Sequence, residues 1–186
     1  MTLSDLIQRE NNGVSHKYLM FWGHKPEPNG EIGVGCLSQW WPSTFLVEGV
    51  QYQSAEHFMM AEKARLFQDE QALADILSAT HPAEAKKIGR RVRGFNPLTW
   101  ADHRFEIVVR GNFEKFRQNE REGVFLRNTG DQVLVEASPR DRIWGIGMSK
   151  NHPNATQPSK WRGKNLLGFA LMEARAQLRS QVWGSS

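Results

Sequence analysis

One stretch of the sequence places a carboxylate and an amine on the same side of a predicted helix. Glu56, Met60 and Lys63 stand at positions i, i+4 and i+7, so they share one helix face. Two turns of helix separate the carboxylate from the amine by about 10 Å, which is too far for a tight ion pair. We therefore expect the two groups to flank a ligand that occupies the space between them.

A second carboxylate, Asp141, opens a segment that combines an aromatic ring with glycines. Trp144 and Gly145 follow within residues 141–147, and glycine lets backbone amides come close to a ligand. This composition predicts a loop that can approach a flat ligand. Two interpretations of Asp141 fit. It binds ribose hydroxyls or assists protonation, like one of the paired carboxyls in glycoside hydrolysis, or it caps the turn after Pro139.

Other aromatic and cationic residues are candidates for binding a base and a phosphate. Trp100 and Trp144 suit stacking on a pyrimidine or purine ring, worth ~1–3 kcal/mol per base, although each equally suits a place in the core. Arg90 belongs to a basic cluster whose guanidinium groups suit phosphate oxygens, unless the cluster is only a solvated face. Asn165 stands at a predicted helix start, where free amides bind anions or where Asn165 serves only as a cap. The basic cluster comprises Lys86, Lys87, Arg90, Arg91 and Arg93.

The overall composition limits the class of protein. The chain has 186 residues and a formal net charge of +4, which suits one domain and favours anionic partners, whether nucleic acid or phosphorylated metabolites. Cys36 is the one cysteine, so an intrachain disulfide is excluded and a reducing compartment is expected. The six histidines lack paired metal-ligand spacing, so we expect neither a metal nor a cofactor.

The sequence also bears on where the protein works. No apolar run approaches the roughly 18 residues that a membrane span needs. The first residues lack the basic lead and the apolar segment of a signal peptide. We therefore expect a cytoplasmic protein.

Helices dominate the predicted secondary structure. Ser54 suits the N-cap of the helix that carries Glu56 and Lys63, and Pro82 suits the first position of a later helix. Thr99 is expected to cap a long helix with an apolar period of 3.6 residues. The expected helices cover residues 54–67, 70–79, 82–93, 99–116, 121–128 and 165–178, and the expected strands cover 18–22, 37–41, 44–47 and 132–136.

The order of these elements predicts the fold class. The sequence contains no internal repeat and no linker between segments. We expect one α+β domain, mainly α-helical with a few short strands, over residues 18–180. Residues 1–17 are expected to form an N-terminal extension.

Three motifs, taken in order, resemble those of the NADAR family, also called YbiA-like. They are Tyr52-Gln53-Ser54-Ala55-Glu56-His57, then Asp141 with Trp144-Gly145, and then Gly163-Lys164-Asn165-Leu166-Leu167-Gly168. The resemblance covers roughly residues 18–178 and implies the YbiA-like fold and N-glycosidase activity. Members similar to the bacterial and plant proteins cleave the ribosylamine bond of early riboflavin-pathway intermediates and release ribose 5-phosphate. Others remove ADP-ribose from guanine bases. The segments at 24–38 and 148–162 are longer than in the compact bacterial form. The resemblance therefore implies the choice of substrate less directly than it implies the fold and the reaction class.

The chemistry of the family implies roles for individual residues. In an exocyclic N-glycoside, the nitrogen lone pair opens the ribose ring to an imine, with which a primary amine can exchange. The resemblance assigns this amine to Lys63, whose pKa must then be lowered by burial or by a cationic neighbour. The alternative is a surface lysine that forms ion pairs with Glu62. Glu56 either handles protons for the ring oxygen and for water or is only an acid at a helix N-terminus. Tyr52, the first residue of the first motif, is also expected to bind substrate because of the resemblance.

Three hypotheses about function follow. The leading one is an N-glycosidase that hydrolyses phosphorylated ribosylaminopyrimidines through a lysine imine. The second keeps the fold but takes ADP-ribosylated guanine, in a nucleotide or in DNA. The third is a non-catalytic module that binds ADP-ribose or nucleic acid. The expected partner is thus a small molecule or a nucleic acid and not a membrane, and the sequence indicates no oligomeric state.

Overall fold

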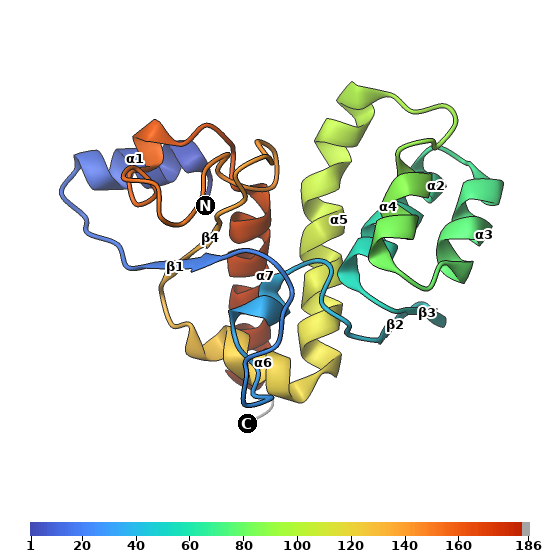
Figure 1. Ribbon diagram of the computed structural model, residues 1–186, viewed down its shortest axis with the longest axis horizontal. Helices are drawn as coiled ribbons and strands as arrows, with labels where there is room; N and C mark the ends of the chain where they lie inside the picture. Colours follow the sequence, from blue (N-terminus) through green and yellow to red (C-terminus); the bar gives the residue numbers. More distant parts are fainter. Residues whose placement is uncertain (184–186) are drawn as a thin grey trace. The chain divides into compact units, whose positions relative to one another are not determined.

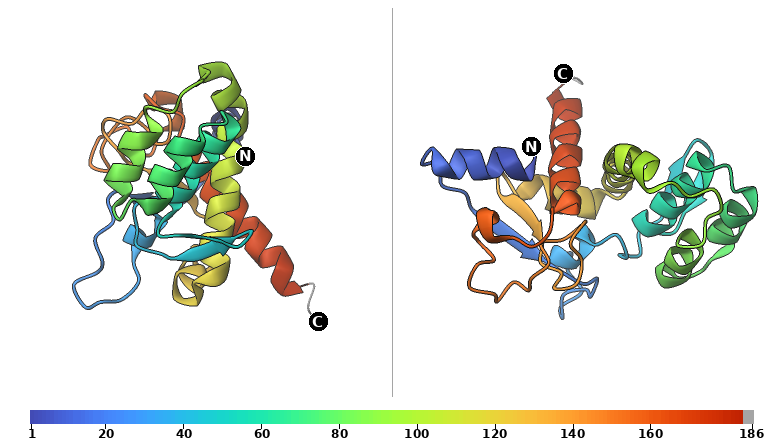
Figure 2. Two further views of the ribbon diagram at one scale, coloured as in Figure 1. Left: turned by 90° about the vertical axis from the view of Figure 1, so that its right-hand side faces the viewer. Right: turned by 90° about the horizontal axis from the view of Figure 1, so that it is seen from above.

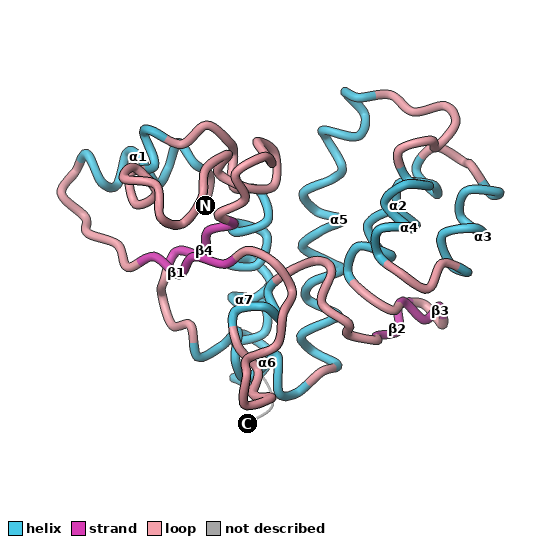
Figure 3. Tube along the Cα trace, viewed as in Figure 1, coloured by secondary structure: helices cyan, strands magenta, loops and turns pink. Residues whose placement is uncertain are grey.

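Two compact units make up the chain. The computed structural model describes residues 1–183. One unit, here called the split unit, combines Met1–Ser38 with Val124–Ser186, and the other, here called the central unit, is Gln39–Gly123. Helices predominate, with four short strands among the described residues (Figure 3). The mainly helical α+β class expected from the sequence is confirmed.

The central unit is built around one buried helix. Its elements are β2 Phe45–Val47, β3 Val50–Tyr52, α2 Ala55–Leu66, α3 Glu70–Ser78, α4 Pro82–Gly89 and α5 Pro97–Gln118. α2 packs against α3, α4 and α5 (Figure 1). Gly111 of α5 makes this approach possible, because a Cβ atom there would lie 2.5 Å from a ring carbon of Phe58. Side-chain caps fix the start of α2, since the hydroxyl of Ser54 accepts a hydrogen bond from the N–H of His57.

The split unit centres on a pair of parallel strands. Its elements are α1 Leu3–Asn11, β1 Tyr18–Phe21, η1 Val34–Leu37, β4 Val133–Glu136, η2 Pro158–Lys160 and α7 Leu166–Trp183, and α6 Glu120–Asn128 runs across the boundary between the units. β1 pairs with β4 in a register that matches Tyr18 with Val133. α7 packs against β4 (Figure 2). Leu6 anchors α1 in this unit, because its side chain is fully buried.

Three local predictions were wrong. The helix expected over residues 82–93 ends at Gly89, and Arg90 is its C-cap. Residues 37–41 do not form a strand, because the end of η1 and a turn occupy this segment and the carbonyl of Gln39 accepts a hydrogen bond from the N–H of Glu56 instead of joining a sheet. The long helix α5 begins at Pro97 rather than after Thr99. Asn96 is its cap, because the amide oxygen of Asn96 accepts hydrogen bonds from the N–H groups of Leu98 and Thr99.

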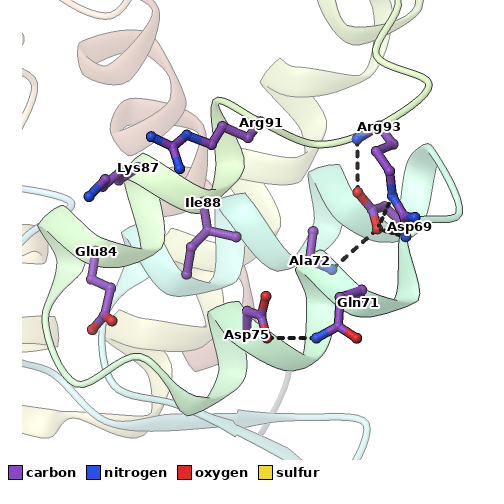
Figure 4. A pocket seen from close by; sticks show the side chains of 9 residues that line it. All are labelled: Asp69, Gln71, Ala72, Asp75, Glu84, Lys87, Ile88, Arg91 and Arg93. Atoms are coloured by element: carbon purple, nitrogen blue, oxygen red, sulfur yellow. Dashed lines mark hydrogen bonds and ion pairs between the residues drawn. The ribbon is translucent and has the colours of Figure 1, made fainter.

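Asp69 ties α3 to the segment that follows α4 (Figure 4). One carboxylate oxygen accepts hydrogen bonds from the N–H of Ala72 and from the guanidinium of Arg93, and the other accepts the backbone N–H of Arg93 at 2.8 Å. The side-chain hydrogen bonds from Arg93, followed by its backbone N–H, hold the pKa of Asp69 well below its usual range. This carboxylate therefore stabilises the fold only while it is ionised.

We predict that Asp69→Asn reduces the pH dependence of stability in acid. The folded-state pKa of Asp69 is lowered from the ordinary value of 3.8, so its stabilising effect is present above that value and is lost as the pH falls. Melting temperatures recorded by circular dichroism from neutral pH to about pH 2 should decline less steeply in Asp69→Asn than in the wild type. Asp75→Asn, which changes an exposed acid of α3, is the control. Identical slopes for the wild type and Asp69→Asn would contradict this role.

Candidate functional site

The central unit holds Lys63 in a buried position with neutral partners. The residue is 9% exposed, and Nζ donates a hydrogen bond to the carbonyl oxygen of Gly89 at 2.7 Å. The rings of Phe95 and Trp100 lie 4.1 Å and 5.6 Å from Nζ. The structure thus brings two of the predicted site residues, Lys63 and Trp100, together.

Burial lowers the pKa of the Lys63 amine. Glu62, the neighbouring acid, forms ion pairs with Arg65 at 2.6 Å and with Arg110 at 3.7 Å. Within residues 1–183, no carboxylate forms an ion pair with Lys63. Lys63 therefore differs from the surface lysine paired with Glu62 that was the alternative interpretation. A buried amine without a counter-charge is the usual environment of a nucleophilic lysine.

Glu56 occupies the first turn of α2 and is buried, with a relative exposure of 2%. Its backbone N–H donates to the carbonyl oxygen of Gln39 at 2.9 Å. A carboxylate in the first turn of a helix interacts favourably with the positive end of the helix dipole. The position suits both a catalytic acid or base and a helix N-terminal charge, so the role of Glu56 stays a prediction.

A second buried amine belongs to Lys115 on α5, which the sequence reasoning did not select as a site residue. Its side chain is completely buried, and Nζ lies 4.8 Å from the centre of the Phe116 ring. Asn112, one turn earlier, donates to the side-chain oxygen of Gln39 at 2.8 Å, and Gln39 also contacts the start of α2 through Glu56. The apolar period of this helix could have revealed Lys115, because a lysine beside core positions is unusual.

Two further candidates of the central unit have different surroundings. Tyr52 is buried against Phe45 and Phe58, and its hydroxyl accepts a hydrogen bond from Arg65 at 2.8 Å. Burial raises the pKa of the Tyr52 hydroxyl. Arg90 directly follows the carbonyl that binds Lys63, at the C-cap of α4, and is exposed. The exposed guanidinium of Arg90 suits binding of a substrate phosphate. Tyr52, by contrast, forms its hydrogen bond and its ring contacts with other residues of the protein.

Asp141, Trp144 and Gly145 belong to the split unit. The Oδ1 atom of Asp141 accepts hydrogen bonds from the N–H groups of Ile143 and Trp144, each at 2.8 Å, which is the turn-capping geometry. Trp144 is half-buried. Gly145 packs tightly, because a Cβ atom there would lie 2.8 Å from the carbonyl oxygen of Glu136. Roles for these residues in substrate binding or catalysis stay predictions.

Asn165 lies between β4 and α7 and is completely buried. Its side-chain oxygen accepts the N–H of Glu136 at 2.9 Å, and its side-chain nitrogen donates to the carbonyl of Leu134 at 2.9 Å. The residue has a positive φ of 53°, which asparagine tolerates better than most residues. This geometry gives Asn165 a structural role in joining the strand to the helix, whether or not it also contacts substrate.

One cavity of about 360 Å³ lies between α3 and α4 (Figure 4). Its cations and acids are balanced, and Lys63 is not among the residues that line it. The lining residues are Asp69, Gln71, Ala72, Asp75, Glu84, Lys87, Ile88, Arg91 and Arg93. Within residues 1–183, no group of three His, Cys, Asp or Glu side chains is placed to hold a metal ion. In the same range, no helix is long and apolar enough to cross a membrane.

Comparisons with known proteins agree on one family. The family model described as NADAR domain matches residues 20–179. N-glycosidase R617 of Acanthamoeba polyphaga mimivirus is 42% identical over 87% of this chain and 96% of its own length. A riboflavin biosynthesis protein of Vibrio vulnificus is 31% identical over 80% of this chain but only 36% of its own length. The NMR structure of the E. coli protein YbiA has a similar fold, with a TM-score of 0.72 at 24% identity, covering 91% of this chain and 90% of that one.

We predict that Asn165→Ala destabilises the fold. The change leaves the N–H of Glu136 and the carbonyl of Leu134 without their side-chain partner, and each buried polar group left in this way costs about 1–3 kcal/mol. Urea unfolding should therefore give a lower midpoint than in the wild type and in the exposed control Asn151→Ala. Unchanged stability in Asn165→Ala, together with weaker substrate binding, would contradict the structural role.

Proposed function

The chain belongs to the NADAR domain family, and on this premise we propose that it hydrolyses phosphorylated ribosylaminopyrimidine intermediates of riboflavin biosynthesis. Because its mimivirus relative is named an N-glycosidase, this chain is an enzyme of that class. The bond cleaved is the N-glycosidic bond to ribose, and the products are an aminopyrimidine and ribose 5-phosphate. The name of the Vibrio relative supports the riboflavin assignment.

The observation that carries the proposed mechanism is the environment of Lys63. Its amine is buried, has a lowered pKa and is held by a backbone carbonyl instead of a carboxylate. Such an amine loses its proton more readily than a surface lysine, and only the neutral form attacks an imine carbon. Lys63 is therefore the proposed nucleophile.

The proposed reaction has three steps. The lone pair of the exocyclic nitrogen forms a C=N bond to C1 of ribose, while the bond from C1 to the ring oxygen breaks and that oxygen takes a proton. The Lys63 amine then adds to C1, and the aminopyrimidine leaves as a neutral amine after proton transfer. Water finally adds to the lysine imine, releasing the sugar aldehyde and restoring the Lys63 amine.

Two carboxylates are proposed to act in these steps, Glu56 in proton transfer and Asp141 in binding the sugar. Glu56 donates the proton to the ring oxygen and later accepts a proton from water. It lies on the same helix as Lys63, and its burial excludes bulk water from the carboxylate. Asp141 is the proposed ligand for the ribose hydroxyls, with its second oxygen available beside the one that caps the turn.

The remaining predicted site residues would bind the ends of the substrate. Trp100, whose ring lies near Nζ of Lys63, is proposed to stack on the pyrimidine. Trp144 and Gly145 stay proposed substrate-binding residues of the split unit. Arg90 is proposed to bind the phosphate. Tyr52 and Asn165 are proposed to support the site through Arg65 and through β4, with which their side chains form hydrogen bonds.

A second candidate substrate is ADP-ribosylated guanine. The basic cluster favours it, because the side chains of Lys87, Arg90, Arg91 and Arg93 are exposed at the end of α4, and a nucleic acid that carries the modified guanine adds further phosphates for these cations to bind. Incubation with each substrate, followed by mass spectrometry of the products, separates the two. Ribose 5-phosphate from the small substrate supports the riboflavin assignment. Binding without cleavage of either substrate would instead indicate a non-catalytic module.

We predict that Lys63→Ala abolishes turnover. Loss of an essential nucleophile lowers kcat by roughly 10⁴-fold or more. In the wild type, borohydride added during turnover should attach the mass of a reduced sugar phosphate to the peptide that contains Lys63. Lys17→Ala, which removes an exposed lysine, should behave like the wild type. Full activity in Lys63→Ala would exclude the imine mechanism.

We also predict that Glu56→Gln slows catalysis but still permits covalent trapping on Lys63. Loss of a general acid or base lowers kcat by about 10²–10⁴-fold, while the amine itself is retained. The control is Glu106→Gln, which changes an exposed acid of α5. Steady-state kinetics should give a lower kcat for Glu56→Gln than for this control. A kcat equal to that of the wild type would mean that Glu56 acts only as a charge at the helix N-terminus.

A further inference from the structure

We propose that Gly89 and Phe95 are positioning residues for the Lys63 amine, Gly89 through its carbonyl oxygen and Phe95 through its ring. This inference rests on the proposed function, because positioning matters for catalysis only if Lys63 is the nucleophile. Neither residue was selected from the sequence. Both are identified by their contacts with Nζ, at 2.7 Å for the Gly89 oxygen and 4.1 Å for the Phe95 ring.

Gly89 is required at its position by the packing of α4 on α2. A Cβ atom at residue 89 would lie 2.1 Å from the sulfur of Met60 and 2.9 Å from its Cγ atom. Met60 and Lys63 are on the same face of α2. The absence of a side chain at residue 89 therefore lets the end of α4 come close enough for its carbonyl to reach the amine.

A carbonyl partner has a chemical advantage over a carboxylate. An ammonium group donates a hydrogen bond to it, and a neutral amine can still donate one of its two hydrogens. The hydrogen bond can therefore persist when Lys63 loses its proton, and it directs the nitrogen lone pair away from α4. A carboxylate would favour the ammonium form and would be left as a buried charge after deprotonation.

The Phe95 ring covers the amine from the segment between α4 and α5. Residue Phe95 is 44% exposed, and its ring packs edge-on against Phe67, with ring centres 5.3 Å apart. Its face attracts the ammonium form, and its bulk keeps water from the buried nitrogen. The Phe95 ring thus lies between the Lys63 amine and solvent, whereas the Gly89 carbonyl contacts the amine from the inside of the protein.

Charged groups around α2 do not account for the position of the amine. On α2 itself, Glu62 pairs with Arg65 and with Arg110 of α5. Asp69, before α3, pairs with Arg93, after α4. Arg90 and Lys86 of α4 carry the same charge as an ammonium and cannot attract it. Among the described residues, the contacts of Nζ are therefore with a neutral carbonyl and two rings.

The test of Phe95 measures the titration of Lys63 directly. Competitive acetylation with acetic anhydride across pH, with mass spectrometry of the Lys63 peptide, yields the midpoint of its titration without any turnover. Phe95→Leu keeps an apolar cover but removes the ring, so the midpoint should fall by about half a pH unit. Phe95→Tyr keeps the ring and should match the wild type. An unchanged midpoint in Phe95→Leu would overturn the role of Phe95.

The test of Gly89 uses a compensating pair of substitutions. Gly89→Ala should lower kcat by about 100-fold, as expected for a misplaced reacting group, with a smaller change in KM. Met60→Ala removes the sulfur and Cγ that the new methyl group would meet, so the double variant should regain activity relative to Gly89→Ala. If the double variant is as slow as Gly89→Ala while both remain folded by circular dichroism, the role of Gly89 is overturned.

Failure of the Lys63 mechanism and failure of the Phe95 positioning role would give different experimental results. Full activity of Lys63→Ala would remove the proposed mechanism, and acetylation of Phe95→Leu would still report whether the ring contacts the amine. Conversely, an inactive Lys63→Ala combined with an unshifted midpoint in Phe95→Leu would retain the mechanism and remove Phe95 from it.

Discussion

The hydrogen bond between the Lys63 amine and the Gly89 carbonyl is the contact on which the candidate site depends. It joins two helices that are far apart in sequence, and it gives a buried amine a partner without giving it a counter-charge. Because taking an ammonium group out of water is costly, this arrangement moves the amine toward its neutral form. The chemistry proposed for the chain needs that form, so the packing of α4 on α2 is directly linked to reactivity.

The rest of the central unit holds these two helices in place. Each of α2, α3, α4 and α5 begins at a residue whose side chain accepts a backbone N–H, and these caps are Ser54, Asp69, His81 and Asn96. Such caps fix where a helix starts and therefore which residues face the helix next to it. Gly89 and Gly111 then permit close approach to α2 from two sides. Local sequence signals and close packing thus act together to bury Lys63.

The sequence predicted most of the helices because their signals are local. The N-cap at Ser54 and the proline at the start of α4 are confirmed, as are the strands at β1 and β4 to within a residue or two. Thr99 was expected to cap α5, but the helix begins two residues earlier, at Pro97, and Asn96 is its cap. The strand expected at residues 37–41 has apolar content, but its backbone caps α2 instead of finding a partner strand.

The site was predictable only in part. Spacing placed Glu56 and Lys63 on one face of a helix, yet it did not indicate that most of α2 would be buried. Phe95 was missed because it reaches Lys63 from the segment after α4, and no spacing within α2 reveals that contact. Lys115 was overlooked although a lysine beside the core positions of α5 is a signal that the sequence does carry. The contact between Lys63 and the carbonyl of Gly89 could not be predicted from the sequence either. Every residue has a carbonyl, and only tertiary packing determines which one lies beside the amine.

The most direct test of the account is the pKa of Lys63, measured by NMR titration of its side-chain ε-carbon in the intact protein, with Lys63→Arg to assign the signal. The account predicts a midpoint clearly below the ordinary value of 10.5 and a shift that disappears on unfolding in urea. A midpoint at or above that of the exposed lysines would contradict it, because the amine would then be charged and in contact with water.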